Sequence, residues 1–340
     1  MFTGENVSKV ELVCPAGAFP ALRAAVDNGA DAVYIGFRDA TNARNFPGLN
    51  FDRETAAKAI RYAHDHHSKV LLALNTYPQP QTWSVWCDAV DQAADLGVDA
   101  LILADLGLMR YARDKWPNLR LHLSVQGSAT SHEAIALYRR LFGIERVILP
   151  RVLSMPQVAR VIENSDVAVE VFAFGSLCVM VEGRCYLSSY VTGESPNTCG
   201  ACSPASAVEW KETANGRDVN LNGVLIDRFN QDESAGYPVI CKGRFKVNGK
   251  LDYAIEEPTS LSVLDILPDL IKIGVSAIKV EGRQRSPAYV AQVTKVLREA
   301  LDSAQKDPLT YRPRQEWVSQ LGRVAEGTTH TLGALDREWQ

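Results

Sequence analysis

Short apolar segments recur along the chain, and several of them follow a helical stretch that ends in glycine. The glycine is expected to cap the preceding helix, and the apolar run after it suits a strand that is buried on both faces. Four copies of this unit occupy residues 28–35, 97–103, 143–149 and 274–280. Four more apolar segments of strand length lie at residues 10–13, 69–74, 121–125 and 167–174.

Amphipathic stretches separate most of these segments. Examples are residues 53–66, 83–96 and 131–142, where apolar residues recur at helical spacing. Eight alternations of strand and helix predict a (β/α)8 TIM-like barrel. A doubly wound open sheet is the alternative. A dinucleotide-binding form of that sheet is disfavoured, because no G-x-G-x-x-G motif follows the first strand.

One interval interrupts the alternation. Residues 175–261 lie between the seventh and eighth expected strands, are much longer than an ordinary connection, and carry five of the seven cysteines. An insertion there projects from the C-terminal face of a barrel, where such folds keep their active sites. We expect one barrel domain over residues 1–340, with this insertion, a closing helix at 286–306 and a C-terminal tail over 308–340.

Charge and hydropathy narrow the functional classes. The net charge of −4 and the pI of about 5.9 argue against a broad nucleic-acid surface, which needs a basic face. No apolar run is long enough to span a bilayer, and the first residues lack the apolar core of a signal peptide. We therefore expect a cytoplasmic protein without a transmembrane segment. Thiols stay reduced there, so its cysteines point to metal or redox chemistry.

The cysteine spacing leaves the kind of metal site open. Thiolates suit both zinc and iron–sulfur clusters. Structural zinc sites usually show two tight C-x2-4-C pairs, and only Cys199 and Cys202 form such a pair here. Unligated thiols remain a third possibility. Four glycines near the cysteines would let backbone N–H groups turn toward sulfur, and three nearby cations could offset cluster charge: Gly175, Gly183, Gly200, Gly243, Arg184, Lys242 and Arg244.

Two runs are more specific. Residues 170–178, EVFAFGSLC, and residues 183–188, GRCYLS, resemble the signature of peptidase family U32, the collagenase-like peptidases. The resemblance extends to residues 11–17, 30–36, 42–44, 149–154, 256–261 and 279–287. It implies a [4Fe–4S] cluster on Cys178, Cys185, Cys202 and Cys241. Cys199 is an extra thiol, which leaves open whether Cys199 or Cys202 is the third ligand.

Within the family, the length and single-domain plan most resemble the ubiquinone-biosynthesis branch. That resemblance implies a heterodimer with a UbiV-like family member and oxygen-independent hydroxylation of a ubiquinone precursor ring. It further implies prephenate as the oxygen donor, small-molecule substrates and no nucleic acid. Whether the chain is itself catalytic or a scaffold stays open.

The sequence disfavours two alternative activities. Peptidase activity is disfavoured because the sequence has neither an H-E-x-x-H nor a G-x-S-x-G motif. RNA hydroxylation, to which other family members are related, would need a basic surface. Seven residues that follow expected strands are candidates for substrate binding, with the arginines suited to a carboxylate: Tyr34, Asn42, Arg44, Gln126, Arg151, Glu281 and Arg283. A structural salt-bridge ring is the alternative for these residues, and no general acid or base is assigned.

Overall fold

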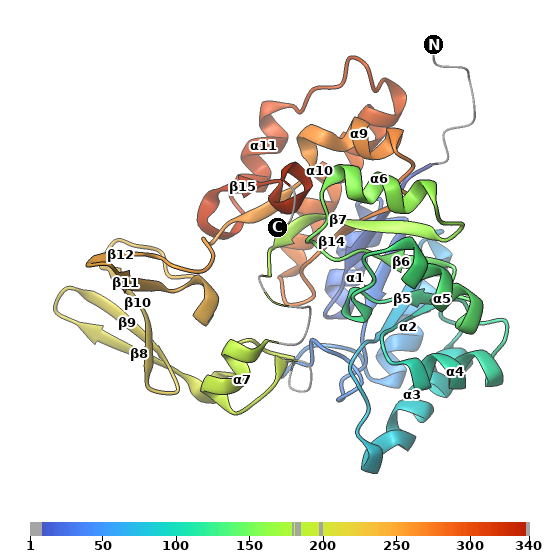
Figure 1. The fold of residues 1–340 in the computed structure, drawn as a ribbon, viewed down its shortest axis with the longest axis horizontal. Coiled ribbons are helices and arrows are strands. Elements are labelled where there is room, and N and C mark those ends of the chain that lie inside the picture. The colour runs from blue at the N-terminus through green and yellow to red at the C-terminus, as the bar shows by residue number, and fades with distance from the viewer. Residues whose placement is uncertain (1–8, 179, 181–184, 197–199, 338–340) are drawn as a thin grey trace.

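Eight parallel strands form a closed barrel in the computed structural model, which describes residues 9–178, 180, 185–196 and 200–337 (Figure 1). Each strand pairs with its neighbour in chain order, and the last strand pairs with both the first and the seventh. The strands are β1 (Glu11–Pro15), β2 (Ala32–Ile35), β3 (Lys69–Leu74), β4 (Ala100–Leu103), β5 (Leu121–Leu123), β6 (Arg146–Ile148), β7 (Ala168–Ser176) and β14 (Ala277–Val280). The predicted barrel is confirmed.

Helices cover the outside of the barrel. They are α1 (Phe19–Asp27), α2 (Arg53–Asp65), α3 (Trp83–Leu96), α4 (Leu106–Lys115), α5 (His132–Phe142), α6 (Met155–Glu163), α9 (Leu267–Lys272), α10 (Pro287–Lys306) and α11 (Gln315–Gly322). Each buries one apolar stripe, as α2 does with Ala56, Ala59, Ile60 and Ala63. The predicted glycine caps are confirmed at Gly97 and Gly143, which end α3 and α5 in the left-handed conformation.

The barrel strands are buried on both faces. All residues of β2, β4 and β14 are buried, which explains the continuous apolar sequences of β2 and β4, whereas β14 also encloses Lys279. The core extends outward from these strands to the helices, where the largest fully buried side chain is Trp317 of α11.

The insertion begins where β7 leaves the barrel. The first part of this nine-residue strand pairs with β14, and its end pairs antiparallel with β13 (Ser260–Ser262). Between β7 and β13 lie α7 (Tyr186–Thr192), β8 (Val208–Thr213), β9 (Gly216–Leu221), β10 (Val224–Asn230), β11 (Arg244–Val247) and β12 (Lys250–Tyr253). The sheet of β8–β10 and the hairpin of β11 and β12 project from one side of the barrel, at the left of Figure 1.

The residues after 308 return to the barrel. Helix α11 packs against α10, and β15 (His330–Thr331) pairs with β13. A short 3-10 helix, η6 (Glu326–Thr328), lies between α11 and β15 in the chain. Within the part of the chain that is described, no helix has the length and apolar character needed to cross a membrane.

Candidate functional site

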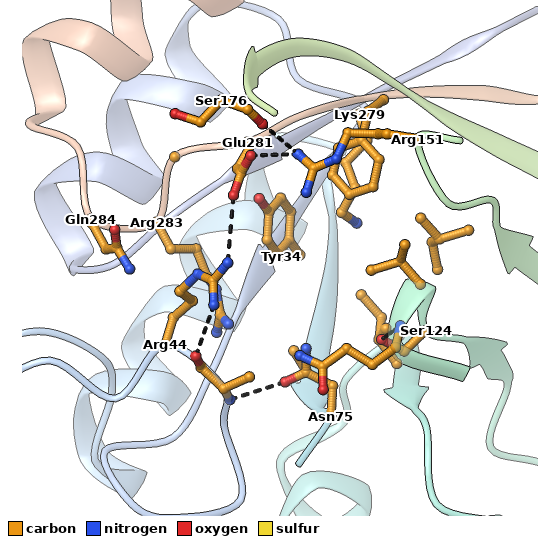
Figure 2. Close-up of a pocket in the computed structure, with 18 of the residues that line it drawn as sticks. Tyr34, Arg44, Asn75, Ser124, Arg151, Ser176, Lys279, Glu281, Arg283 and Gln284 are labelled. Carbon is orange, nitrogen blue, oxygen red and sulfur yellow. Dashed lines mark hydrogen bonds and ion pairs between the residues drawn. The ribbon is translucent and has the colours of Figure 1, made fainter. Parts of the chain in front are cut away.

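A cavity of about 110 Å³ opens at the C-terminal ends of the barrel strands (Figure 2). Residues that end or follow β2, β3, β5, β6, β7 and β14 line it, as expected for this fold. Six of the seven predicted substrate residues are among its lining residues: Tyr34, Arg44, Gln126, Arg151, Glu281 and Arg283. Residues chosen from the sequence because they follow expected strands therefore lie together in one cavity.

Asn42 lies outside the cavity lining. Its side chain is buried, donates to the Phe37 carbonyl at 2.9 Å, and accepts from the Arg44 backbone N–H at 3.0 Å. Asn42 therefore orients the segment that carries Arg44.

Two arginines bind the same carboxylate on the cavity wall. Arg44 Nη2 lies 3.6 Å from Glu281 Oε1, and Arg151 Nη1 lies 2.6 Å from Glu281 Oε2. Arg151 also donates to the Ser176 carbonyl at 2.7 Å and stacks over Phe172 at 4.3 Å. Burial raises the pKa of Glu281, but Arg151 and Arg44 outweigh it and hold the pKa below its usual value. Glu281 is therefore an anion flanked by cations.

Arg283 brings an unused donor to the cavity. The residue is only 5% exposed, and its Nη1 has no hydrogen-bond partner. Burial lowers its pKa to about 10, so it stays cationic at neutral pH. Its position depends on Gly36, because a Cβ there would lie 2.4 Å from Nη1. An unpartnered buried guanidinium N–H is suited to an anionic ligand.

Lys279 lines the cavity near the end of β14. It is also the first member of a layer of ion pairs inside the barrel. Its Nζ donates to Glu170 Oε1 at 2.8 Å, and Glu170 Oε2 accepts from Arg146 at 3.2 Å. Arg146 also pairs with Glu11, which in turn pairs with Lys69. Burial lowers the pKa of Lys279, although Glu170 opposes the shift. Our sequence reasoning missed Lys279, even though a lysine inside a fully buried strand is itself a signal.

Gln126 and Tyr34 complete the polar lining. Gln126 Oε1 is buried without a partner, whereas its backbone carbonyl accepts from Tyr77 at 2.8 Å. The Tyr34 hydroxyl donates to the Val280 carbonyl at 2.9 Å, and burial raises its pKa. The Tyr34 ring therefore presents a face to the cavity while its hydroxyl is already engaged.

The four predicted ligand cysteines converge beside this cavity from four segments. Cys178 follows β7, Cys185 caps the N-terminus of α7, Cys202 lies in the loop before β8, and Cys241 lies in the 3-10 helix η4 (Ile240–Lys242). Burial raises the pKa of Cys241 to about 12, and the nearby thiols of Cys178, Cys202 and Cys185 add to the shift. The four thiols are thus close enough to act on one another electrostatically.

Hydrogen bonds fix two of these segments together. Cys185 Sγ accepts from the Ser188 N–H at 3.4 Å, and the Ser188 hydroxyl donates to the Cys202 carbonyl. Burial raises the pKa of Cys202, whereas the charge of Arg44 lowers it. Arg44 therefore acts on the thiol group as well as on the cavity.

A glycine brings the cysteine loop against the cavity rim. Gly200 has a φ of +79°, and a Cβ on it would lie 2.4 Å from the Asn45 backbone nitrogen and 3.1 Å from the Ala43 carbonyl oxygen. Only glycine permits this approach without displacing one of the two backbones. Cys202, two residues later, is thereby held near Arg44.

The remaining cysteines and flanking cations divide by position. Cys14 and Cys87 are buried in the barrel and its helices, where they pack as small apolar residues. Lys242 acts on Cys241 and Cys202, whereas Arg244 is held by Asp227 and Glu233. Cys199, Gly183 and Arg184 lie outside the described residues.

The donor set fits an iron–sulfur cluster. Four partly buried thiols from separate segments, with Lys242 and Arg44 beside them, match the soft ligands and the compensating charge that such a cluster needs. Among the described residues, no three His, Cys, Asp or Glu side chains are grouped tightly enough to hold one metal ion. A cluster of several ions spaces its thiolates more widely, and binding would favour the thiolate form despite burial.

Comparisons with known proteins identify the family. The sequence profile of peptidase family U32 matches residues 17–336. The uncharacterized protease MJ0090 of Methanocaldococcus jannaschii is 34% identical over 86% of this chain and 65% of its own length.

Several relatives are named tRNA hydroxylation proteins. Protein P1 of Bacillus subtilis is 28% identical over 95% of this chain and 70% of its own length. Protein P of Haemophilus influenzae is 30% identical over 87% of this chain and 68% of its own length. The chain thus spans about two thirds of the length of these relatives, and it belongs to peptidase family U32.

Proposed function

We propose that this chain is an iron–sulfur protein that supports oxygen-independent ring hydroxylation in ubiquinone biosynthesis. The observation that carries the proposal is the convergence of Cys178, Cys185, Cys202 and Cys241 beside a cavity lined by arginines. A [4Fe–4S] cluster held there would supply electron transfer. The relatives named for tRNA hydroxylation support hydroxylation as the reaction class.

The cavity supports a carboxylate as the second substrate. Arg283 offers a buried N–H without a partner, and Arg44 and Arg151 lie on the same wall. Prephenate, which carries two carboxylates and a 2-oxo group, is the oxygen donor in this proposal. In it, Arg283 binds a carboxylate of prephenate, and Glu281 keeps the other two arginines in place.

The insertion supports a protein partner. Its strands expose several large apolar side chains, including Trp210, Val224 and Leu251. Large apolar side chains exposed on strands that project from the barrel are available for contact with a partner. We propose that a UbiV-like family member binds there to form a heterodimer.

RNA hydroxylation is the second candidate, because several relatives are named for tRNA hydroxylation and one is named as a 23S rRNA 5-hydroxycytidine synthase. This stands in tension with our expectation that the chain binds no nucleic acid. The net charge of −4 favours the small-molecule substrate, since RNA binding draws on a basic surface.

A deletion strain separates the two candidates. We expect ubiquinone to be lost without oxygen and kept with oxygen, and to be restored by the wild-type gene but not by Cys185→Ala. Both quinones and modified tRNA nucleosides should be measured by mass spectrometry in the same cultures. Normal anoxic ubiquinone together with a missing hydroxylated nucleoside would replace our proposal with the RNA candidate.

A further inference from the structure

We propose that Lys279 is an imine-forming lysine that binds the carbonyl carbon of a 2-oxo acid in the barrel cavity. The inference rests on the proposed function for the role of that acid as oxygen donor. It assigns to Lys279 a covalent role in that same site.

The amine is positioned by groups that are themselves fixed. Lys279 is 5% exposed and lines the cavity, and its Nζ donates to Glu170 Oε1 at 2.8 Å. Glu170 is fully buried and is held from its other oxygen by Arg146 at 3.2 Å. Nζ lies 4.0 Å from the centroid of the Tyr34 ring, so its place is defined by an anion and by an aromatic face.

The surroundings favour a reactive amine. Burial lowers the pKa of Lys279, and the charges of Arg146 and Arg283 lower it further, against the opposing effect of Glu170. Lysines that form imines are activated in this way, by removal from water and by neighbouring cations. Lys279 thus combines cavity access, fixed geometry and a larger share of free amine than an exposed lysine has.

The same cavity offers a partner for a carboxylate. The Arg283 guanidinium lies 5.7 Å from the Tyr34 ring centroid and has an Nη1 without a hydrogen-bond partner. Lys279 and Arg283 therefore lie beside the same ring, and both line the one cavity. A carbonyl for the amine and a carboxylate for the guanidinium define a 2-oxo acid.

The step balances without an added oxidant or reductant. The Nζ–carbon bond forms, and the carbonyl oxygen leaves as water with two of the ammonium protons. The third proton stays on nitrogen, so the iminium keeps one positive charge. The ion pair with Glu170 is therefore retained after the reaction.

An ion-pair layer with a purely structural role is the alternative. Buried ion pairs often add no stability compared with apolar side chains of similar volume. The layer extends from Lys279 to the partly exposed Lys69, and only Lys279 among its five members lines the cavity. Lys279 is therefore positioned by the ion-pair layer but faces the cavity, unlike the other four members.

Borohydride trapping tests the inference directly. The full chain, purified without oxygen, is incubated with pyruvate and borohydride, digested, and analysed by peptide mass spectrometry. We expect a reduced adduct at Lys279 at pyruvate concentrations too low to label exposed lysines such as Lys58. Lactate, which has the carboxylate but no carbonyl, should form no adduct and should protect Lys279 from pyruvate.

Three variants sharpen the test. Lys279→Arg keeps the charge beside Glu170 and should abolish the adduct, whereas Lys58→Arg should leave it unchanged. Arg283→Gln should raise the pyruvate concentration for half-maximal trapping about tenfold or more. Labelling of Lys279 no faster than of Lys58, or no protection by lactate, would overturn the inference using wild-type protein alone. If Lys279 forms the adduct but the deletion strain still makes ubiquinone without oxygen, the proposed function is wrong and the inference about Lys279 is retained.

Discussion

The ammonium of Lys242 forms an ion pair with the carboxylate of Glu326, although the two residues lie 84 positions apart in the chain. Their side chains are 6% and 21% exposed. The pair connects η4, which carries Cys241, to η6 near the end of the chain. The thiol group is thus tied to a segment that supplies none of the four proposed ligands.

Removal of the charge on Glu326 should destabilise the fold. Glu326→Gln keeps the shape but leaves Lys242 buried without its anion, and we expect a loss of about 3 kcal/mol. Urea unfolding followed by circular dichroism measures it. The control is Glu54→Gln, which breaks the exposed pair with Lys58 and should cost less than about 0.5 kcal/mol. Equal losses in both variants would contradict the expected role of burial.

A substitution that leaves every cysteine in place should still reduce iron binding. Gly200→Ala places a Cβ 2.4 Å from the Asn45 backbone nitrogen, so the cysteine loop must move away from the cavity rim. We expect the variant, reconstituted without oxygen, to lose most of its iron. Gly193→Ala is the matched control, since Gly193 also has a positive φ but nothing lies within 4 Å of an added Cβ.

The third ligand can be assigned by single replacements. Cys178→Ala, Cys185→Ala, Cys202→Ala and Cys241→Ala should each lower bound iron and sulfide after anaerobic reconstitution, because each removes a thiolate. Cys199→Ala should retain both. Full iron in Cys202→Ala combined with loss in Cys199→Ala would transfer the role to Cys199.

Acid should weaken the ion-pair layer inside the barrel. Burial raises the pKa of Glu11, but Lys69 and Arg146 outweigh it, so the folded pKa lies below the ordinary 4.5. The unfolded chain then binds the proton more tightly, so Glu11 stabilises the fold above pH 4.5, and this stabilisation is lost as the pH falls through the folded pKa. Glu11→Gln should make the unfolding free energy depend less steeply on pH below that value. Parallel pH profiles for wild type and variant would refute this.

The barrel could be predicted because its strands are buried on both faces. Such strands produce continuous apolar runs, and β3 and α3 begin and end as the sequence indicates. The strands of the insertion gave no such signal. Five of the six residues of β8 are exposed, and among the described residues its sheet fully buries a small core of Val219, Leu221 and Ile226.

The cavity residues that follow the ends of barrel strands could be predicted from the sequence. Arg44, Arg151 and Arg283 were identified in this way. The ion-pair layer was not, because its partners lie on strands far apart in sequence. Arg146 and Glu11 are separated by 135 positions and meet only when the barrel closes. The hydrophobic pattern of one strand shows that a charged side chain is buried. It does not show which other strand supplies the side chain of opposite charge.

The pairing of β13 between β7 and β15 sets an order of events during synthesis. The segment that carries the four cysteines lies between β7 and β13, and β13 gains its second neighbour only when residues 330–331 have emerged. Glu326, the partner of Lys242, also comes late. A nascent chain can close most of its barrel while the thiol group is still loosely held. The cysteine-bearing segments are therefore expected to reach their final arrangement only after residues 326–331 have been synthesised.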